Sequence, residues 1–319
     1  MTPVELSHPV YSNEEAARKH LEAIRWPTGD VICPHCGSTE GARELGGKSM
    51  GPGWYYCEDC QDKFTVRTGT VYERSHVPLH KWLLAFRLLA SSKKGMSAHQ
   101  LGRTLNVSYK TAWFIGHRVR AAMGPMPGKS GGPLGGEGKI VEADTTYIGG
   151  KEKNKHASKR DGKKIGGMGK QIVHTLVERG GRARSHHIAN VTGKTLRPIL
   201  FTNVDRKSAL MTDTAGGYMD AGKEFFRHEM VDHGAGEYVR NDAHSNTVEG
   251  YFATLKRGIV GTYHHVSEAH LQAYLHEFDF RHSNRAALKV DDCERTSRAI
   301  KGAEGKRLQY RMPSKTANA

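Results

Sequence analysis

Two pairs of closely spaced cysteines constrain the fold of the first third of this chain. Two residues separate the members of each pair, Cys33 with Cys36 and Cys57 with Cys60, and twenty residues lie between the pairs. Four thiolates in two such knuckles can surround one ion tetrahedrally and close its coordination shell. A redox pair or an iron site is the alternative interpretation of the spacing. We expect one structural, non-catalytic Zn²⁺ on these four cysteines.

The charge of the chain indicates a polyanionic partner. Its 319 residues carry a formal net charge of +15, which favours nucleic acid. A membrane surface is the competing polyanion, but the sequence has no long basic amphipathic helix, no run of about 18 apolar residues and no secretion signal at its start. We expect an intracellular DNA-binding protein with no membrane partner.

Residues 97–123 predict two short helices joined by a turn at Leu105-Asn106-Val107. Ser108 is the expected cap of the second helix. Such a pair is typical of a helix-turn-helix, and a small connecting helical bundle is the alternative. In the first interpretation, the start of the second helix enters a DNA groove and Arg118 holds phosphate. The residues expected in the groove are Ser108, Tyr109, Lys110 and Thr111.

The second half of the chain changes to strand patterns. Residues 139–150, 170–179 and 182–190 predict three strands, with Gly180-Gly181 as the hairpin turn between the last two. A helix interrupted by Pro198 follows, and a fourth strand ends on Asp213. Further helices are expected at 244–258, where Gly258 is the stop, and at 267–282. This order fits an α/β, ribonuclease-H-like layer.

Three acidic residues occupy positions that suggest a functional role for their carboxylates. Asp144 interrupts an apolar strand, Asp213 ends the fourth strand, and Glu249 follows after 35 intervening residues. Converging carboxylates repel one another unless divalent cations are present. Hard oxygen ligands suit two Mg²⁺ or Mn²⁺ ions about 4 Å apart, which is a phosphodiester-cleaving arrangement.

The helix at 244–258 places polar side chains beside its buried stripe. Asn246, Glu249 and Lys256 fall within an arc of roughly 80°. An ordinary amphipathic helix with a solvated face is the alternative. The basic insertion 151–170 is either a solvated loop or a loop that orders on a phosphate backbone. Its candidate DNA contacts, with one more on the helix, are Lys155, Lys159, Arg160, Lys163, Lys164 and Arg257.

Several stretches resemble DDE-type insertion-sequence transposases with an N-terminal zinc ribbon, the ISXO2-like family. They are RWPTGDVICPHC, FTVRTGTVYERSHVPLHKW, VEADTTYIGGKEKNKH and HSNTVEGYFATLKRGIVGTYHHV. The resemblance implies that Asp144, Asp213 and Glu249 form the metal-binding triad and that Lys256 contacts phosphate near the cleavage point. Thr145 departs from the family, which usually has an acid there. Some relatives use asparagine as the third residue of the catalytic triad. Asn246 could therefore share the role of Glu249 or replace it.

The resemblance implies a transposase that binds terminal inverted repeats and catalyses metal-dependent DNA cleavage and strand transfer. Its partners would be double-stranded transposon ends, target DNA and further copies of the chain, in the nucleoid of a bacterium or archaeon. A noncatalytic DNA-binding regulator and a metal-dependent nuclease are the alternatives. The expected order is an N-terminal helix (1–27), a zinc ribbon (28–76), a helix-turn-helix (77–123), a Gly/Pro linker (124–138), a ribonuclease-H-like catalytic domain (139–288) and a basic tail (289–319).

Overall fold

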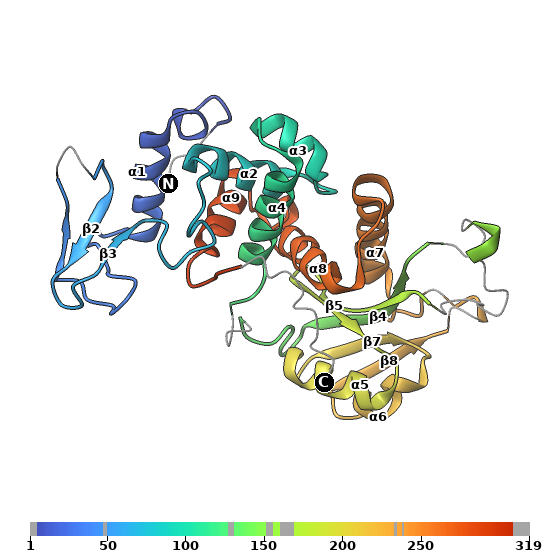
Figure 1. The fold of residues 1–319 in the computed structure, drawn as a ribbon. Coiled ribbons are helices and arrows are strands. Elements are labelled where there is room, and N and C mark those ends of the chain that lie inside the picture. The colour runs from blue at the N-terminus through green and yellow to red at the C-terminus, as the bar shows by residue number, and fades with distance from the viewer. Residues whose placement is uncertain are drawn as a thin grey trace, which may run out of the picture. The chain divides into compact units, whose positions relative to one another are not determined.

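The computed structural model describes residues 5–46, 50–126, 131–150, 156–159, 169–232, 235–237 and 239–308 (Figure 1). The chain divides into two compact units. Unit 1 takes in Met1–Ser91, Ala98–Met126 and Asp292–Ala319, and unit 2 takes in Ser92–Ser97 and Pro127–Asp291. No helix among the described residues combines the length and apolar character needed to cross a membrane.

The N-terminal part of unit 1 consists of a helix and a three-stranded sheet. Helix α1 (Glu14–Arg25) is capped by Asn13, whose Oδ1 accepts a hydrogen bond from Ala16 N at 2.9 Å. Strands β1 (Ala42–Glu44), β2 (Trp54–Cys57) and β3 (Lys63–Thr65) form an antiparallel sheet in that order. The buried Trp26 ring lies edge-on to Tyr55 at 5.3 Å and Phe64 at 6.5 Å, which fastens the ribbon to the end of α1.

Four further helices complete unit 1: α2 (Leu79–Ser91), α3 (Ala98–Leu105), α4 (Tyr109–Met123) and α9 (Asp292–Lys301). The segment expected as a basic tail from residue 289 includes α9 in its described part, and this helix packs against α2. Ala299 and Ile300 are buried there, and Arg295 donates to Ala90 O at 3.3 Å. Lys306 Nζ donates to the carbonyls at the end of α4. Small apolar residues and backbone carbonyls therefore accommodate a sequence that is basic overall.

Unit 2 is built on a five-stranded sheet with the order β6-β5-β4-β7-β8. Its strands are β4 (Ile140–Ile148), β5 (Gln171–Glu178), β6 (Ala183–Ile188), β7 (Ala209–Asp213) and β8 (Arg227–Val231). The first three are antiparallel, and β7 and β8 run parallel to β4. The four predicted strands are confirmed, and the sequence interpretation missed β8. The arrangement is ribonuclease-H-like.

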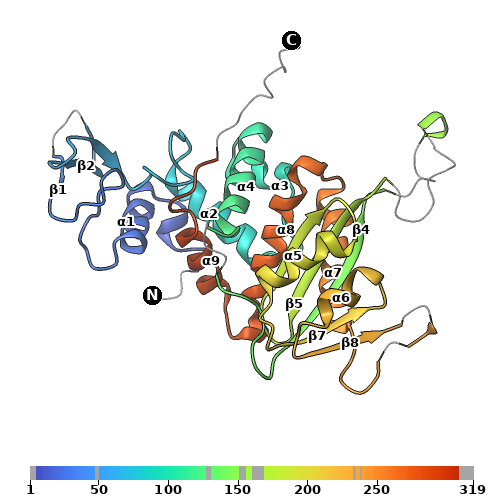
Figure 2. The same cartoon turned by 90° about the horizontal axis from the view of Figure 1, so that it is seen from below.

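Helices cover both faces of this sheet (Figures 1 and 2). On one face, Val141 and Ala143 share a core with Leu196 and Leu200 of α5 (Gly193–Asn203), beside the short α6 (Met219–Gly222). On the other face lie α7 (Asn246–Gly258) and α8 (Glu268–Ser283). Because side chains alternate along a strand, the even-numbered positions of β4 face α7.

Two segment boundaries in the structure differ from those expected from the sequence. Leu134, in the expected linker, is fully buried and donates its N–H to Asn203 O at 2.7 Å, so residues 131–138 belong to unit 2. Gly258 ends α7, but the chain continues as a π-helix over Ile259–Tyr263. A Cβ at Gly258 would lie 2.4 Å from Phe278 Cζ. The glycine therefore permits close packing on α8 and does not stop the helical turn.

Candidate active site and DNA interface

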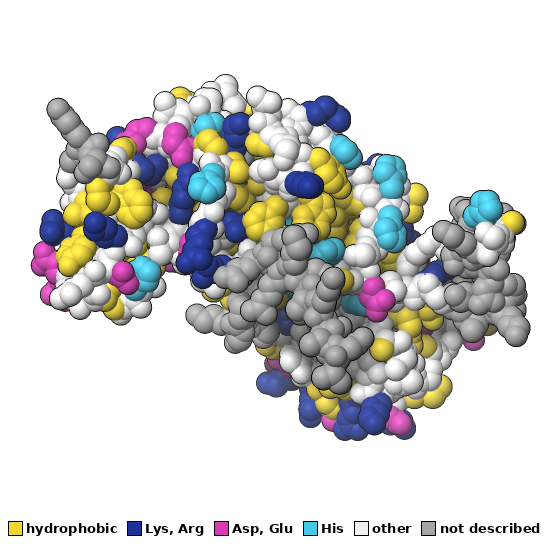
Figure 3. All heavy atoms as spheres, viewed as in Figure 1, with side chains coloured by type: hydrophobic (Ala, Val, Ile, Leu, Met, Phe, Trp, Pro, Cys, Tyr) yellow, Lys and Arg dark blue, Asp and Glu magenta, His cyan; other side chains and the backbone are white. Residues whose placement is uncertain are grey.

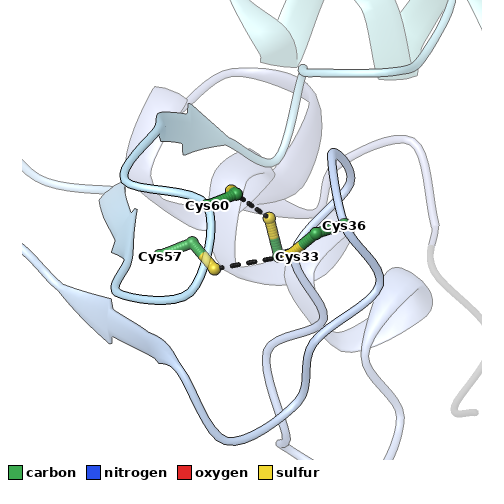
Figure 4. A group of neighbouring side chains, drawn as sticks. All are labelled: Cys33, Cys36, Cys57 and Cys60. Atoms are coloured by element: carbon green, nitrogen blue, oxygen red, sulfur yellow. Dashed lines mark hydrogen bonds between the residues drawn. The ribbon is translucent and has the colours of Figure 1, made fainter.

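The four cysteines of unit 1 form a metal site of zinc-ribbon type. Their sulfurs point toward one another (Figure 4), with Cys33 to Cys60 at 3.7 Å and Cys36 to Cys57 at 3.6 Å. All four sulfurs lie within 4.8 Å of one another. A Zn²⁺ with four sulfurs at about 2.3 Å has tetrahedral edges of about 3.8 Å. The residues therefore fit a structural Zn²⁺.

Two of the acids lie beside each other on neighbouring parallel strands. Asp144 is in the middle of β4 and Asp213 ends β7. The register pairs Ala143 with Thr212, so the next step along both strands brings Asp144 level with Asp213, about 4.8 Å away across the sheet. Ala143 belongs to the core shared with α5. By alternation, both acids are on the opposite face, the one that α7 covers.

The third acid comes to this face on α7. Val248, Phe252 and Leu255 are buried in the cluster that α7 forms with β5 and α8. Glu249 lies on the flank of that stripe and is exposed. Its Oε1 accepts a hydrogen bond from the buried Ser245 Oγ at 3.1 Å. Asp144 and Asp213 thus share one face of the sheet, here called the acid face, and α7, which packs on that face, carries Glu249.

The carboxylates are less tightly assembled than the sulfurs. Over the described ranges, the cysteines are the set of three or more potential metal ligands whose donor atoms all lie within 4.8 Å. Asp144 Oδ1 accepts from Thr145 N at 2.6 Å, and Asp213 Oδ1 accepts from Ala215 N at 3.2 Å. The donors are all carboxylate oxygens, which suit Mg²⁺ or Mn²⁺ by chemistry.

Thr145, where the family usually has an acid, points into a neutral network behind the acid face. Its Oγ1 lies 3.2 Å from Tyr218 Oη, which lies 3.1 Å from His174 Nδ1. Burial lowers the pKa of His174 to about 3 and raises the pKa of Tyr218, so both side chains are neutral. A carboxylate at 145 would enter this buried network, because it lies on the face opposite Asp144. The departure therefore leaves the acid face unchanged.

A second network fixes α7 to the sheet and to α8. Asp279 is buried and accepts hydrogen bonds from Tyr251 Oη at 2.6 Å, Ser185 Oγ at 2.7 Å and Ser185 N at 2.8 Å. Burial raises the pKa of Asp279 to about 6, although these hydrogen bonds act to lower it. Tyr251 therefore anchors the middle of the helix that carries Glu249.

Sequence reasoning missed Glu142, a fully buried carboxylate two residues before Asp144 on the same face of β4. Its Oε2 accepts from Thr247 N at 2.8 Å and Val248 N at 2.9 Å, at the start of α7. Its sequence signal was the alternation in Val-Glu-Ala-Asp, which puts two acids on one side of a strand that is otherwise apolar.

The predicted polar residues of α7 other than Glu249 are also exposed: Asn246, Lys256 and Arg257. Lys256 borders a hollow of about 780 Å³ whose lining includes Tyr147, Gln171, His264 and Glu268. This hollow lies at the end of β4, next to Gly150 and Gly169, from which the basic insertion departs. The exposed Lys256 side chain therefore lies beside the end of β4.

The two helices and the turn predicted over residues 97–123 are present as α3 and α4. Ser108 Oγ accepts from Thr111 N at 3.2 Å and caps α4, while Asn106 adopts a positive φ of 50° in the turn. Tyr109 is 49% exposed and stacks on His99 at 4.4 Å, and Lys110 is exposed. The start of α4 thus presents aromatic, cationic and hydroxyl groups to solvent.

Arg118 does not face solvent with these residues. It is 8% exposed, its Nη1 donates to Val71 O at 2.7 Å and Glu73 O at 3.1 Å, and its guanidinium lies 4.3 Å from the Phe114 ring centroid. A buried guanidinium whose donors serve two backbone carbonyls is structural. The assignment of Arg118 as a phosphate contact is therefore corrected.

The predicted contacts of the basic insertion lie mostly outside the described residues: Lys155, Arg160, Lys163 and Lys164. Lys159 is the last residue of a short 3-10 helix, Ala157–Lys159. On the described surface, Lys and Arg side chains are exposed on both units (Figure 3). Exposed cationic side chains are therefore not confined to the insertion.

Comparison with known proteins identifies the family. Residues 133–283 match the ISXO2-like transposase domain, and residues 12–63 match the transposase zinc-ribbon domain. A Halobacterium salinarum protein described as an uncharacterized protein in transposable element ISH50 is 32% identical over 297 residues, covering 88% of this chain and 96% of that protein.

A solved structure of a Mos1 strand transfer complex also matches, with 16% identity over 68% of this chain and 73% of that chain. Its TM-score of 0.29 is too low to carry weight. The two domain matches and the near full-length relative agree with the cysteine site and the ribonuclease-H-like sheet. The chain belongs to the ISXO2-like transposase family and has that family's N-terminal zinc ribbon.

Proposed function

We propose that this chain is the transposase of an insertion sequence, which binds the element's terminal inverted repeats and catalyses metal-dependent strand cleavage and transfer. The proposal is supported by the position of the three acids: Asp144 and Asp213 share the sheet face on which α7, with Glu249, packs. Carboxylates brought together on such a face repel one another unless cations are bound.

Asp144, Asp213 and Glu249 would hold two Mg²⁺ or Mn²⁺ ions, and Asn246 at the start of α7 is an additional candidate ligand. Bound there, the ions would activate the attacking oxygen and stabilise the leaving oxygen of a phosphodiester. The protein's part is to fix the three carboxylates on rigid elements. Ser245 contributes by holding the Glu249 carboxylate, and the Thr145 network holds β4 from behind.

The reaction would take place in two steps. In the first, a water oxygen attacks phosphorus at the element's end, the bond to the 3′ oxygen breaks, and that oxygen leaves as a hydroxyl. In the second, this 3′-hydroxyl attacks a phosphodiester of target DNA and displaces another 3′-oxygen. Lys256, on α7 with Glu249, would hold a non-bridging phosphate oxygen.

DNA binding would involve both units. The exposed start of α4, with Ser108, Tyr109, Lys110 and Thr111, suits insertion into a major groove. The basic residues at Lys155, Lys159, Arg160, Lys163, Lys164 and Arg257 would add phosphate contacts. Two element ends must be joined in one event, so we expect at least two copies of the chain in the active complex.

A strand-transfer assay tests the proposal. Labelled duplexes that carry the element's end are incubated with plasmid target, Mg²⁺ and either wild type, Asp144→Asn or the control Asp220→Asn. Asp220 is an exposed acid of unit 2 paired with Lys223. We expect joined product from wild type and the control and none from Asp144→Asn. Cleavage without joining would instead indicate a nuclease, and binding alone would indicate a regulator.

A further inference from the structure

The N-cap serine of α7 does not cap the helix with its side chain. The first N–H groups of a helix have no partner within it, and a serine at the N-cap usually accepts one of them. Here Ser245 makes no such side-chain bond. Its hydroxyl instead donates to Glu249 Oε1 at 3.1 Å. Another group must therefore satisfy the helix start.

That group is the Glu142 carboxylate on β4. It accepts three hydrogen bonds from α7: from Thr247 N at 2.8 Å, Thr247 Oγ1 at 2.8 Å and Val248 N at 2.9 Å. A carboxylate at a helix N-terminus is also favoured by the helix dipole. The sheet thus caps α7 at Thr247 and Val248, and the preceding loop adds one longer bond, which His244 Nδ1 accepts from Asn246 N at 3.4 Å.

Arg179 compensates the buried charge and extends the anchor. Its Nε lies 2.6 Å from Glu142 Oε1, and its terminal nitrogens donate to Asp242 O at 2.8 Å and His244 O at 2.9 Å. The His244 ring also faces this cluster, with Nδ1 3.3 Å from Glu142 Oε1 and 3.0 Å from Arg179 Nη2. Glu142 and Arg179 together hold both the helix start and the segment leading into it.

We propose that Glu142 is a positioning residue for the Glu249 carboxylate. It sets the place of α7 on the sheet and, by replacing Ser245 as the cap, leaves the serine hydroxyl to hold Glu249. Glu142 and Asp144 lie two residues apart on one strand, about 6.6 Å. Strand β4 thus carries both Asp144, one acid of the proposed triad, and Glu142, which positions the helix that carries Glu249. This inference rests on the proposed function of Glu249.

The test compares Glu142→Gln with a matched control, Glu178→Gln. Glu178 is also a buried strand carboxylate of this sheet, but it accepts from Gly135 N and Lys139 Nζ. Glutamine at 142 keeps the size of the side chain but turns an amide donor toward groups that are themselves donors. Thr247→Val is a milder second variant, since it removes only the hydroxyl donor and retains the backbone N–H.

Hydrogen exchange of the full chain tests the anchor without requiring activity. Amides at 246–250 should exchange at least about tenfold faster in Glu142→Gln than in wild type, with a smaller increase in Thr247→Val. Glu178→Gln should leave them unchanged. Equal protection of these amides in wild type, Glu142→Gln and Thr247→Val would overturn the inference.

Single-turnover cleavage of bound end DNA tests the consequence for Glu249. In Glu142→Gln we expect a rate about 10²-fold lower and a higher half-saturating Mg²⁺ concentration, with unchanged affinity for end DNA. A variant that is only destabilised would contain fewer active molecules at every Mg²⁺ concentration. The amplitude of cleavage would then fall, but the half-saturating Mg²⁺ concentration would not change. A midpoint equal to that of Glu178→Gln would contradict the positioning role. If wild type cleaves nothing, the proposed function fails, and the exchange experiment still decides the anchor.

Discussion

Asp144 and Asp213 stand at the same step of two neighbouring parallel strands, one residue beyond the paired Ala143 and Thr212. They are 69 residues apart in number, from 144 to 213, and the parallel β4–β7 pairing alone brings them together. The pair therefore depends on register: a slip of one residue would turn one carboxylate to the α5 face.

The first prediction concerns Asp213, the acid at the end of β7. Asp213→Asn should reduce cleavage of end DNA by at least about 10²-fold, because a neutral amide is a poorer ligand for a hard dication. Affinity for the same DNA, measured by gel shift in Ca²⁺, should stay within about twofold. Retained cleavage in Asp213→Asn would remove this residue from the site.

The second prediction concerns the zinc site. The chain should contain one Zn²⁺ by elemental analysis, and Cys57→Ser should lose it. Cys57 is fully buried, its sulfur lies 3.6 Å from that of Cys36, and metal binding is part of the folding free energy of such a ribbon. Cys293→Ser is the matched control and should keep its zinc, since that thiol lies near Arg87 and away from the cluster. Full zinc content in Cys57→Ser would contradict the assignment.

The sequence predicted those parts of the molecule that local patterns encode. Asn13 and Ser108 mark their helix starts, alternation marks β4, and the two knuckles mark the zinc site. β8 was missed because Arg227–Val231 is an edge strand with mixed polarity, of which only Val231 is buried. α9 was missed because only two of its buried residues, Ala299 and Ile300, are apolar.

The missed side chains depend on partners that are distant in sequence. Arg118 has the composition of a DNA contact, and only the carbonyls of Val71 and Glu73 make it structural. Glu142 is an acid in a strand like Asp144, and only the fold shows that its partners are Thr247 and Val248, 105 and 106 residues away. Local periodicity carries no information on such pairs.

The third prediction separates two basic residues of α4. Lys110→Ala should weaken binding to end DNA and lower the slope of log affinity against log salt by about 1, as for one lost phosphate contact. Arg118→Ala should instead lower the free energy of unfolding by about 2 kcal/mol or more, because two carbonyls lose their buried donor. Salt titrations and urea unfolding measure the two effects. An unchanged salt slope in Lys110→Ala would remove it from the interface.

The fourth prediction concerns pH and Asp279, whose pKa is raised by burial to about 6. A carboxyl with a raised folded-state pKa stabilises the fold below its unfolded pKa and loses that contribution as pH rises through the folded value. Relative to Asp279→Asn, the wild-type free energy of unfolding should fall by about 3 kcal/mol between pH 4 and about pH 7. Urea unfolding of both proteins across this range measures the difference. Parallel pH profiles would show that folding does not raise the pKa of Asp279.

The most direct test of the catalytic account is anomalous diffraction from crystals of the chain bound to end DNA and Mn²⁺. The account predicts anomalous peaks at about 2.2 Å from carboxylate oxygens of Asp144, Asp213 and Glu249, beside the phosphate to be cleaved. Peaks coordinated by other side chains, with these three carboxylates turned away from the DNA, would contradict it.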